Sequence, residues 1–414
     1  MIIKNTILFI FLCKIIINLI FKYFSYNGDN SPESLDLIYK YFSKEDIQIG
    51  EEYSKKGFEI SLISMFIDSV FLFLFIFKGF GSKLEEFASK TCKNNYFLTS
   101  LIFISFLYTL DFTLELPFSF YFDYYLEKQF GFSNMTMGSW FIFTLKNFLL
   151  GYISVLFIGI GFLYILKIFK KSWIVLVPLS SILIGLIVSI LFPIYITPLY
   201  YETHEISEGP LKIKILDLCK KENINLSNIF IISESEYSNH TNAYFTGWGN
   251  ERKIFLYDTL VKNHTEDEIV SVLGHEIGHW KNNHQIKDII YSSLLLFFGC
   301  FIINKLFLFT KIENSLFLNE LYNPSSIPFI ILIFGILNFL VMPIENSLSR
   351  HDETEADLEA LILTKDVDSF ISTEIKMAKD NKSRLNPHPL IVLIYYSHPK
   401  TIDRIQLAED FRKK

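Results

Sequence analysis

The chain has 414 residues, of which 50% are hydrophobic, 17% aromatic and only 20% charged, with a formal net charge of −6. This surplus of apolar side chains is too large for a soluble enzyme of the same length, so much of it needs lipid as its solvent. No basic block with interleaved aromatic residues occurs, which excludes nucleic acid as an expected partner.

Seven segments are long and apolar enough to cross a bilayer as helices, since a span needs about 20 mostly apolar residues. They lie near residues 5–22, 60–80, 97–117, 145–168, 173–195, 287–309 and 326–345. Lys14 breaks the first apolar run and no small-residue cleavage site follows, which indicates an uncleaved span rather than a secretory signal. The sequence therefore predicts an all-α polytopic membrane protein.

Two polar regions interrupt the apolar pattern. The predicted division is spans one to five with their loops at 1–197, a polar domain at 198–286, spans six and seven at 287–345, and a second part of the polar domain at 346–414. Two spans form one hairpin, so the two polar regions are expected to meet on the same side of the membrane. Short strands are predicted at 228–232 and 253–257, which indicates a small α+β domain.

The first polar region contains His275-Glu276-Ile277-Gly278-His279, which matches the zinc-hydrolase signature H-E-x-x-H. Thr265 and Glu268 form a capping-box pattern, which predicts that a helix begins near residue 265. Histidines four residues apart then project from one face of this helix, where both can bind a single Zn²⁺ ion. Glu276 lies one residue further round, within reach of water at that ion, and is the candidate base.

Catalytic zinc usually takes three protein ligands, so a further side chain has to come from elsewhere. The second polar region offers the acidic segment 349–357, in which Glu353 and Asp357 are four residues apart. On a helix, one of them can bind the metal while the other accepts a hydrogen bond from a ligand histidine. His351 and Glu355 are competing ligands that spacing alone leaves open, and a solvated helix face is the alternative without metal.

Ionisable residues also occur within or beside the spans, namely Asp68, Asp111, Glu115, Lys146 and Glu345. An ionised group that faces lipid costs several kcal/mol, so these side chains are expected to face the bundle interior or a wet chamber. Pairing between helices or a location at the membrane surface is the alternative.

Taken together, these motifs resemble those of the type I CAAX prenyl endopeptidases, a family of integral-membrane zinc metalloproteases. The resemblance rests on the H-E-x-x-H helix, S-R-x-x-E-x-x-A-D at 349–357, N-A-Y-F at 242–245, Ser397-His398-Pro399 followed by Arg404, the loop 127–133, and Pro198-Leu199 with Glu208-Gly209. It covers most of the chain, roughly residues 50–414, and implies seven helices that enclose a chamber beside a zincin-like catalytic domain.

The resemblance also implies roles for individual side chains. It implies His275, His279 and Glu353 as ligands of one zinc ion per chain, and Glu276 as the catalytic base. The further residues that it implies are Asp357 as the partner of a ligand histidine, Asn242 and Tyr244 beside the substrate, His398 near the developing oxyanion, and Arg404 as a residue that holds the tail in place.

The hypothesis from sequence is a membrane zinc metalloendopeptidase that removes the C-terminal tripeptide from prenylated CAAX proteins. The prenylated substrate and membrane lipid are its expected partners, because the lipid tail delivers the substrate to the bilayer. The resemblance places it in the endoplasmic reticulum membrane, with the nuclear envelope as a second location and the catalytic domain on the cytosolic side. The alternatives are a quality-control protease of the same superfamily, which needs no CAAX box, and a seven-span transporter or receptor whose zinc helix is structural.

Overall fold

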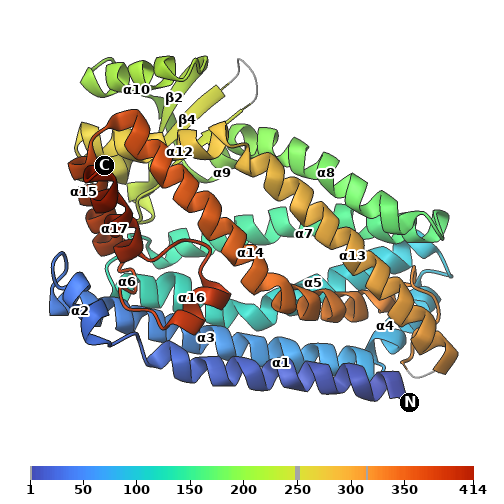
Figure 1. Ribbon diagram of the computed structural model, residues 1–414. Coiled ribbons are helices and arrows are strands. Elements are labelled where there is room, and N and C mark those ends of the chain that lie inside the picture. The colour runs from blue at the N-terminus through green and yellow to red at the C-terminus, as the bar shows by residue number, and fades with distance from the viewer. Residues whose placement is uncertain (1, 248–251, 314–315) are drawn as a thin grey trace.

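The arrangement of the helices follows the hydropathy pattern of the sequence. The computed structural model describes residues 2–247, 252–313 and 316–414. Seven of the described helices are long and apolar enough to cross a membrane, which agrees with the predicted number of spans. Long helices run across the molecule, and a small β-sheet lies at one end of them, at the top left of Figure 1. The prediction of a polytopic helical membrane protein with a small α+β domain is confirmed.

The membrane part consists of long helices joined by short ones. The long helices are α1 (Ile2–Tyr26), α3 (Lys44–Phe77), α5 (Tyr96–Ser119), α7 (Met137–Ile168), α8 (Trp173–Leu191), α13 (His284–Glu313) and α14 (Ile327–Thr364). The short ones are α2 (Pro32–Ile38), α4 (Phe80–Thr91), α6 (Glu127–Gln129) and α9 (Thr197–Tyr200). Two π-helical stretches, η1 (Phe120–Leu126) and η2 (Phe192–Ile196), continue α5 and α8, and a 3₁₀ turn, η4 (Pro324–Ser326), precedes α14.

Several helices extend well beyond the apolar segments from which the spans were predicted. Helix α3 begins at Lys44 rather than near residue 60, because Ser43 and Asp46 form a capping box that starts the helix earlier. Helix α14 continues without interruption through Glu345, where the predicted seventh span ends, as far as Thr364. A membrane span and the acidic segment 349–357 are therefore parts of one helix.

The ionisable residues of the spans follow both of the predicted patterns. Lys14, Asp68 and Asp111 line a cavity of about 490 Å³ between α1, α3, α5, α7 and α14. Glu115 instead accepts hydrogen bonds from the Ser64 hydroxyl at 2.9 and 3.0 Å, which is a pairing between α5 and α3. Lys146 donates to the carbonyl oxygen of Leu199 at 2.8 Å.

The polar part contains a four-stranded sheet in the order β1-β2-β4-β3. Its strands are β1 (Thr203–Glu205), β2 (Leu226–Ile232), β3 (Ala243–Thr246) and β4 (Arg252–Tyr257), and its helices are α10 (Pro210–Lys221), α11 (Asp258–Asn263), α12 (Glu266–Lys281), α15 (Val367–Asp380), α16 (Pro389–Tyr395) and α17 (Thr401–Arg412), with a 3₁₀ turn, η3 (Glu234–Glu236). β2 and β4 are parallel and contain the two predicted strands, while β3 pairs antiparallel with β4 and forms an edge.

Helix α12 is amphipathic, with an apolar face and a polar face on opposite sides. It begins after Thr265, whose side chain forms a capping box with Glu268, so the predicted start is confirmed. Ile269, Leu273 and Ile277 recur at helical spacing and are buried in the core between the sheet and α10. The opposite face of α12 is thereby turned toward α14.

Glycine allows α12 and α14 to approach each other closely. A Cβ atom at Gly278 would lie 2.7 Å from the Cα atom and 2.9 Å from the carbonyl oxygen of Ala356. At Gly274 the nearest backbone atom, the Cα atom of Ala360, is 3.2 Å away. Ala356 and Ala360 are themselves fully buried, so small residues on both helices bring the two backbones together.

We predict that Gly278→Ala lowers the free energy of unfolding by about 1–3 kcal/mol, because the added methyl group meets backbone atoms of α14 and has to push the helices apart. The measurement is the thermal unfolding of the protein in detergent. Gly274→Ala is the matched control: it gains about 1 kcal/mol of helix propensity and meets a wider gap, so it should leave the unfolding temperature nearly unchanged. Equal effects of both substitutions would contradict the role given to the Gly278 contact.

Candidate active site

Three side chains from α12 and α14 converge on one point. The Nε2 atoms of His275 and His279 lie 3.0 Å apart. The Glu353 carboxylate lies 3.3 Å from His275 Nε2 through one oxygen and 3.4 Å from His279 Nε2 through the other. The close contact of α12 with α14 thus brings a carboxylate far along the chain to the two histidines of the H-E-x-x-H motif.

The donor set fits a metal ion. Ligand atoms about 2.1 Å from one tetrahedral ion lie about 3.4 Å from each other, which is close to the separations found here. Oε2 of Glu353 is buried and has no hydrogen-bond partner among the described residues, so an acceptor is left free at the point of convergence. Burial lowers the pKa of His275, but the carboxylates of Asp357 and Glu353 beside its ring outweigh this and raise it to about 10. The two carboxylates therefore stabilise positive charge at the His275 ring.

A chain of charged side chains holds the first histidine in place. Nδ1 of His275 lies 2.8 Å from Oδ1 of Asp357, which is fully buried. Nε of Arg404, on α17, donates to Oδ2 of Asp357 at 2.8 Å, and Nη1 of Arg404 lies 2.9 Å from the Glu374 carboxylate. Burial raises the pKa of Glu374 to about 7, although Arg404 pulls it down. The C-terminal helices thereby fix the ring orientation of a residue on α12.

Glu276 opens onto a pocket beside the cluster. It shares with His279 the lining of a pocket of about 450 Å³. No hydrogen bond from the rest of the described chain occupies its carboxylate. Burial raises the pKa of Glu276, whereas His275 and His279 lower it. A carboxylate whose pKa is raised accepts a proton more readily than an exposed glutamate does, which suits proton exchange.

The structure sorts the remaining predicted residues into those near the cluster and those further away. His398 reaches the cluster, with Nε2 3.3 Å from Glu353 Oε1, and its side chain is 62% exposed and open to a ligand. Asn242 and Tyr244 lie at the start of β3 and within it, and no hydrogen bond within the described ranges joins either to the cluster. Of the competing ligands, His351 is exposed and pairs with its neighbour Asp352.

The other competing ligand, Glu355, belongs to a second group of ligand-type atoms that the sequence analysis missed. His284, Asp352 and Glu355 bring such atoms within 4.8 Å of one another. His284 Nε2 lies 3.2 Å from Glu355 Oε2 and 3.6 Å from Asp352 Oδ1, and its Nδ1 lies 2.9 Å from Nδ1 of His279. The signal in the sequence was a histidine five residues after His279, just before the predicted sixth span.

Proton placement indicates that His284 supports the first group of ligands rather than forming a second metal site. A neutral imidazole that binds a metal through Nε2 carries its hydrogen on Nδ1. His279 Nδ1 then donates to His284 Nδ1, which leaves the hydrogen of His284 on Nε2, facing Glu355 and Asp352. A metal ion bound to His284 Nε2 would move the hydrogen of a neutral His284 to Nδ1, so that two N–H donors would face each other across 2.9 Å with no acceptor between them.

Comparisons with known proteins account for both parts of the chain. Residues 205–411 match the sequence model of peptidase family M48. Residues 21–202 match a model described as the CAAX prenyl protease N-terminal region with five membrane helices. The first match contains every residue of the convergent cluster and of the charged chain behind it.

Individual relatives are similar over most of their length. An uncharacterized metalloprotease of Bacillus subtilis, YhfN, is 26% identical over 94% of this chain and 92% of its own. CAAX prenyl protease 1 of Saccharomyces cerevisiae is 32% identical over 76% of this chain and 73% of its own. The crystal structure of Saccharomyces mikatae Ste24p has a TM-score of 0.84 with 26% identity, and the alignment covers 98% of both chains.

We predict that His284→Leu weakens metal binding by about 10- to 100-fold, because His279 loses the acceptor of its Nδ1 hydrogen. The measurement is a Zn²⁺ titration of the metal-free protein, with the number of bound ions determined in parallel. His284→Asn, whose side-chain oxygen can take the place of Nδ1 as acceptor, should retain most of the affinity. His351→Leu is the control at an exposed histidine and should bind like the wild type. A His284→Leu protein that loses one ion per chain but keeps an unchanged tight site would instead identify a second metal site.

Proposed function

Because this chain belongs to the CAAX prenyl protease family of M48 metallopeptidases, we propose that it removes the C-terminal tripeptide from prenylated CAAX proteins. The chain is a multi-pass membrane metalloprotease, and the proposal concerns its substrate and the bond that it cleaves. The named relatives of yeast origin support this choice of substrate, since one is called CAAX prenyl protease 1.

The observation that carries the proposal is the continuity of α14. This helix runs from Ile327 to Thr364, so it both qualifies as a membrane span and carries Glu353. A site built on the end of a span stays at a fixed distance from the bilayer, where a prenylated protein is concentrated by its lipid. An enzyme acting on soluble substrates has no need of such a placement.

We assign the metal as one Zn²⁺ ion per chain, held by His275, His279 and Glu353. Two histidines and a glutamate form a common ligand set of catalytic zinc. When bound, zinc acts as a Lewis acid that polarises the peptide carbonyl and lowers the pKa of a coordinated water toward about 7. Asp357 and Arg404 keep His275 in the orientation that this requires.

The side chains of the site divide the proton transfers between them. Glu276 takes a proton from the attacking water and returns it to the nitrogen of the leaving amine. Desolvation by the surrounding protein lowers the pKa of His398, so we assign it as a neutral imidazole whose Nδ1 accepts from the Ser397 hydroxyl. Its Nε2 hydrogen is then donated to the carbonyl oxygen as negative charge develops there, a contribution of about 3 kcal/mol for donors of this kind. Tyr244 belongs to the edge strand β3 and Asn242 directly precedes it, and we expect the substrate backbone to lie beside this strand.

The same family membership supports a location in the endoplasmic reticulum membrane and the nuclear envelope, with the catalytic part on the cytosolic side. Prenylated proteins and membrane lipid are the partners that this assignment implies.

We predict that purified enzyme cleaves a farnesylated CAAX peptide and that chelation abolishes cleavage. Glu276→Gln should lower kcat by at least about 100-fold while Zn²⁺ stays bound, because it removes the proton acceptor and none of the ligands. The measurement pairs peptide cleavage with zinc content, and His351→Gln at an exposed position serves as the control with unchanged activity.

Two results would overturn the proposal in different ways. Equal cleavage of farnesylated and unmodified peptides would favour a quality-control protease of the same superfamily. Zinc binding with no cleavage of any peptide, by wild type as by Glu276→Gln, would favour a transporter or receptor with a structural zinc helix.

A further inference from the structure

The pocket beside Glu276 contains a cation that the proposed chemistry does not use. This pocket of about 450 Å³ is bounded by β3, the start of β4, the end of α12 and the start of α13. Glu276 and His279 lie on its wall, and so does Arg252, the first residue of β4. A positive side chain therefore opens onto the same space as the proton acceptor.

The guanidinium of Arg252 is held in place without being neutralised. Its central carbon lies 4.1 Å from the centre of the Trp280 ring, a stacking contact, and the hydroxyl of Ser227 donates to its backbone carbonyl at 2.6 Å. Nε of Arg252 is buried and has no hydrogen-bond partner in the parts of the chain that the structure describes. Within the same ranges no carboxylate forms an ion pair with it. A partly buried cation without a partner is costly unless a ligand supplies the opposite charge.

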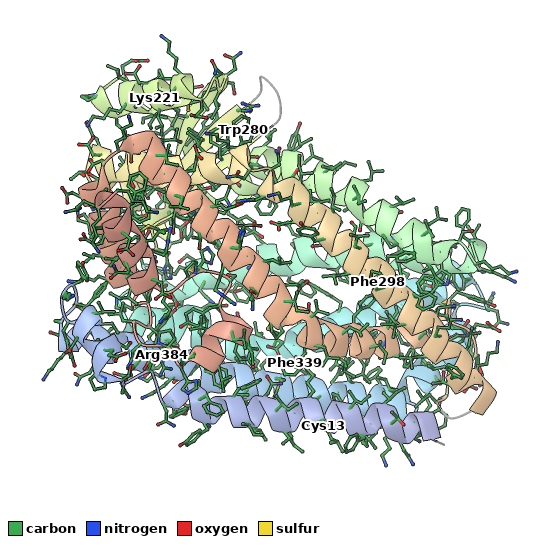
Figure 2. The ribbon with its side chains drawn as sticks, viewed as in Figure 1. Cys13, Lys221, Trp280, Phe298, Phe339 and Arg384 are labelled. Atoms are coloured by element: carbon green, nitrogen blue, oxygen red, sulfur yellow. The ribbon has the colours of Figure 1, made fainter. Side chains whose placement is uncertain are left out.

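Trp280 relates this cation to the reacting centre. It lies beside the β-sheet in Figure 2, on α12, and follows Glu276 by four residues, so the two side chains share one face of the helix. One helical turn, about 5.4 Å, therefore separates the base from the platform on which Arg252 rests. Three extended residues span at most about 10 Å. The separation of the Glu276 and Arg252 side chains, one helical turn plus the thickness of the Arg252–Trp280 stack, is of the same order.

We infer that Arg252 binds the C-terminal carboxylate of the substrate, three residues beyond the cleaved bond. The planar guanidinium matches a carboxylate with two parallel hydrogen bonds, and its two terminal nitrogens, Nη1 and Nη2, have no hydrogen-bond partner among the described residues and can make them. The inference rests on the proposed function, since only a segment that ends in a free carboxylate close to the cleaved bond offers this anion. By holding the C-terminal carboxylate, Arg252 fixes the number of residues between the end of the substrate and the bond that is cleaved.

The other charged residues near the pocket fit this role. Asp288, on α13, and Glu276 are the carboxylates that line it, and neither is paired with Arg252 in the described structure. Lys253 follows on β4, and its side chain therefore points to the opposite face of the sheet, where its Nζ lies 5.9 Å from the Phe230 ring centre. Arg252 is thus the guanidinium or ammonium side chain among the described residues that line the pocket, beside the imidazoles of His279 and His284, and Lys253 is a neighbouring cation outside it.

The experiment uses the full-length enzyme in detergent with two farnesylated CAAX peptides, one ending in a free carboxylate and one in a carboxamide. Wild type should cleave the free acid with a kcat/KM about 10- to 100-fold higher than the amide. Arg252→Gln should abolish this preference by slowing cleavage of the free acid alone. Arg252→Lys should retain part of it, and Lys253→Gln, the matched control, should behave like the wild type.

Binding provides a second measurement that does not depend on turnover. On Glu276→Gln protein, the three-residue product should bind about 10- to 100-fold more tightly as free acid than as amide, and an added Arg252→Gln should remove the difference. The inference is wrong if both peptides are cleaved equally by wild type, or if Arg252→Gln slows both to the same extent, as a purely structural role would. Failure to cleave any prenylated peptide refutes the proposed function, while the binding comparison still decides the role of Arg252.

Discussion

The structure depends on the close approach of two helix backbones, α12 and α14. Gly278 and Ala356 let the axes come near enough for a carboxylate on one helix to reach two histidines on the other. Any larger side chain at this contact would separate the three side chains that we assign to one metal ion, whose donor atoms would lie about 3.4 Å apart around a tetrahedral ion. The apolar core on the other face of α12, with Leu273 and Ile277, holds the helix against the sheet while α14 is fixed in the bundle.

Charged side chains behind the contact of α12 with α14 orient the histidine rings. His275 is oriented by Asp357, which is fully buried and is itself neutralised by Arg404 from the C-terminal helix α17. A buried ion pair of this kind contributes little net stability, because desolvation of both charges opposes their attraction. The ion pair instead orients the imidazole: the Asp357 carboxylate accepts the hydrogen of His275 Nδ1 and leaves Nε2 free at the site. His284 accepts the Nδ1 hydrogen of His279 in the same way, so each of the two imidazoles has its own acceptor.

The sequence was most informative where one local signal decides the structure. Thr265 and Glu268 predicted the start of α12, and the spacing of the histidines predicted the face that they share. Spacing could not choose between Glu353, His351 and Glu355, because all three lie on one polar helix and the choice depends on how α14 is rotated against α12. His284 escaped notice because α12 ends at Lys281 and Asn283 takes a positive φ of 54°, which redirects the chain and returns the next histidine to His279. Glu374 escaped because a glutamate on an amphipathic helix is usually solvated, whereas here Arg404 is its partner.

The proposed function gives a reason for the place of Glu353 at the end of a membrane helix. Glu353 lies eight residues after Glu345, at the end of the apolar segment, which is about 12 Å along a helix axis. In a CAAX substrate the prenyl chain is attached to the cysteine, and removal of three residues cleaves the bond next to that cysteine. The lipid and the reacting carbonyl therefore belong to the same residue and cannot be far apart. For the substrate that we propose, a site about 12 Å beyond the apolar segment would let the lipid remain among the helices while the polar tripeptide points toward the sheet. A helix that breaks between the span and Glu353 would lose this fixed spacing, and α14 does not break.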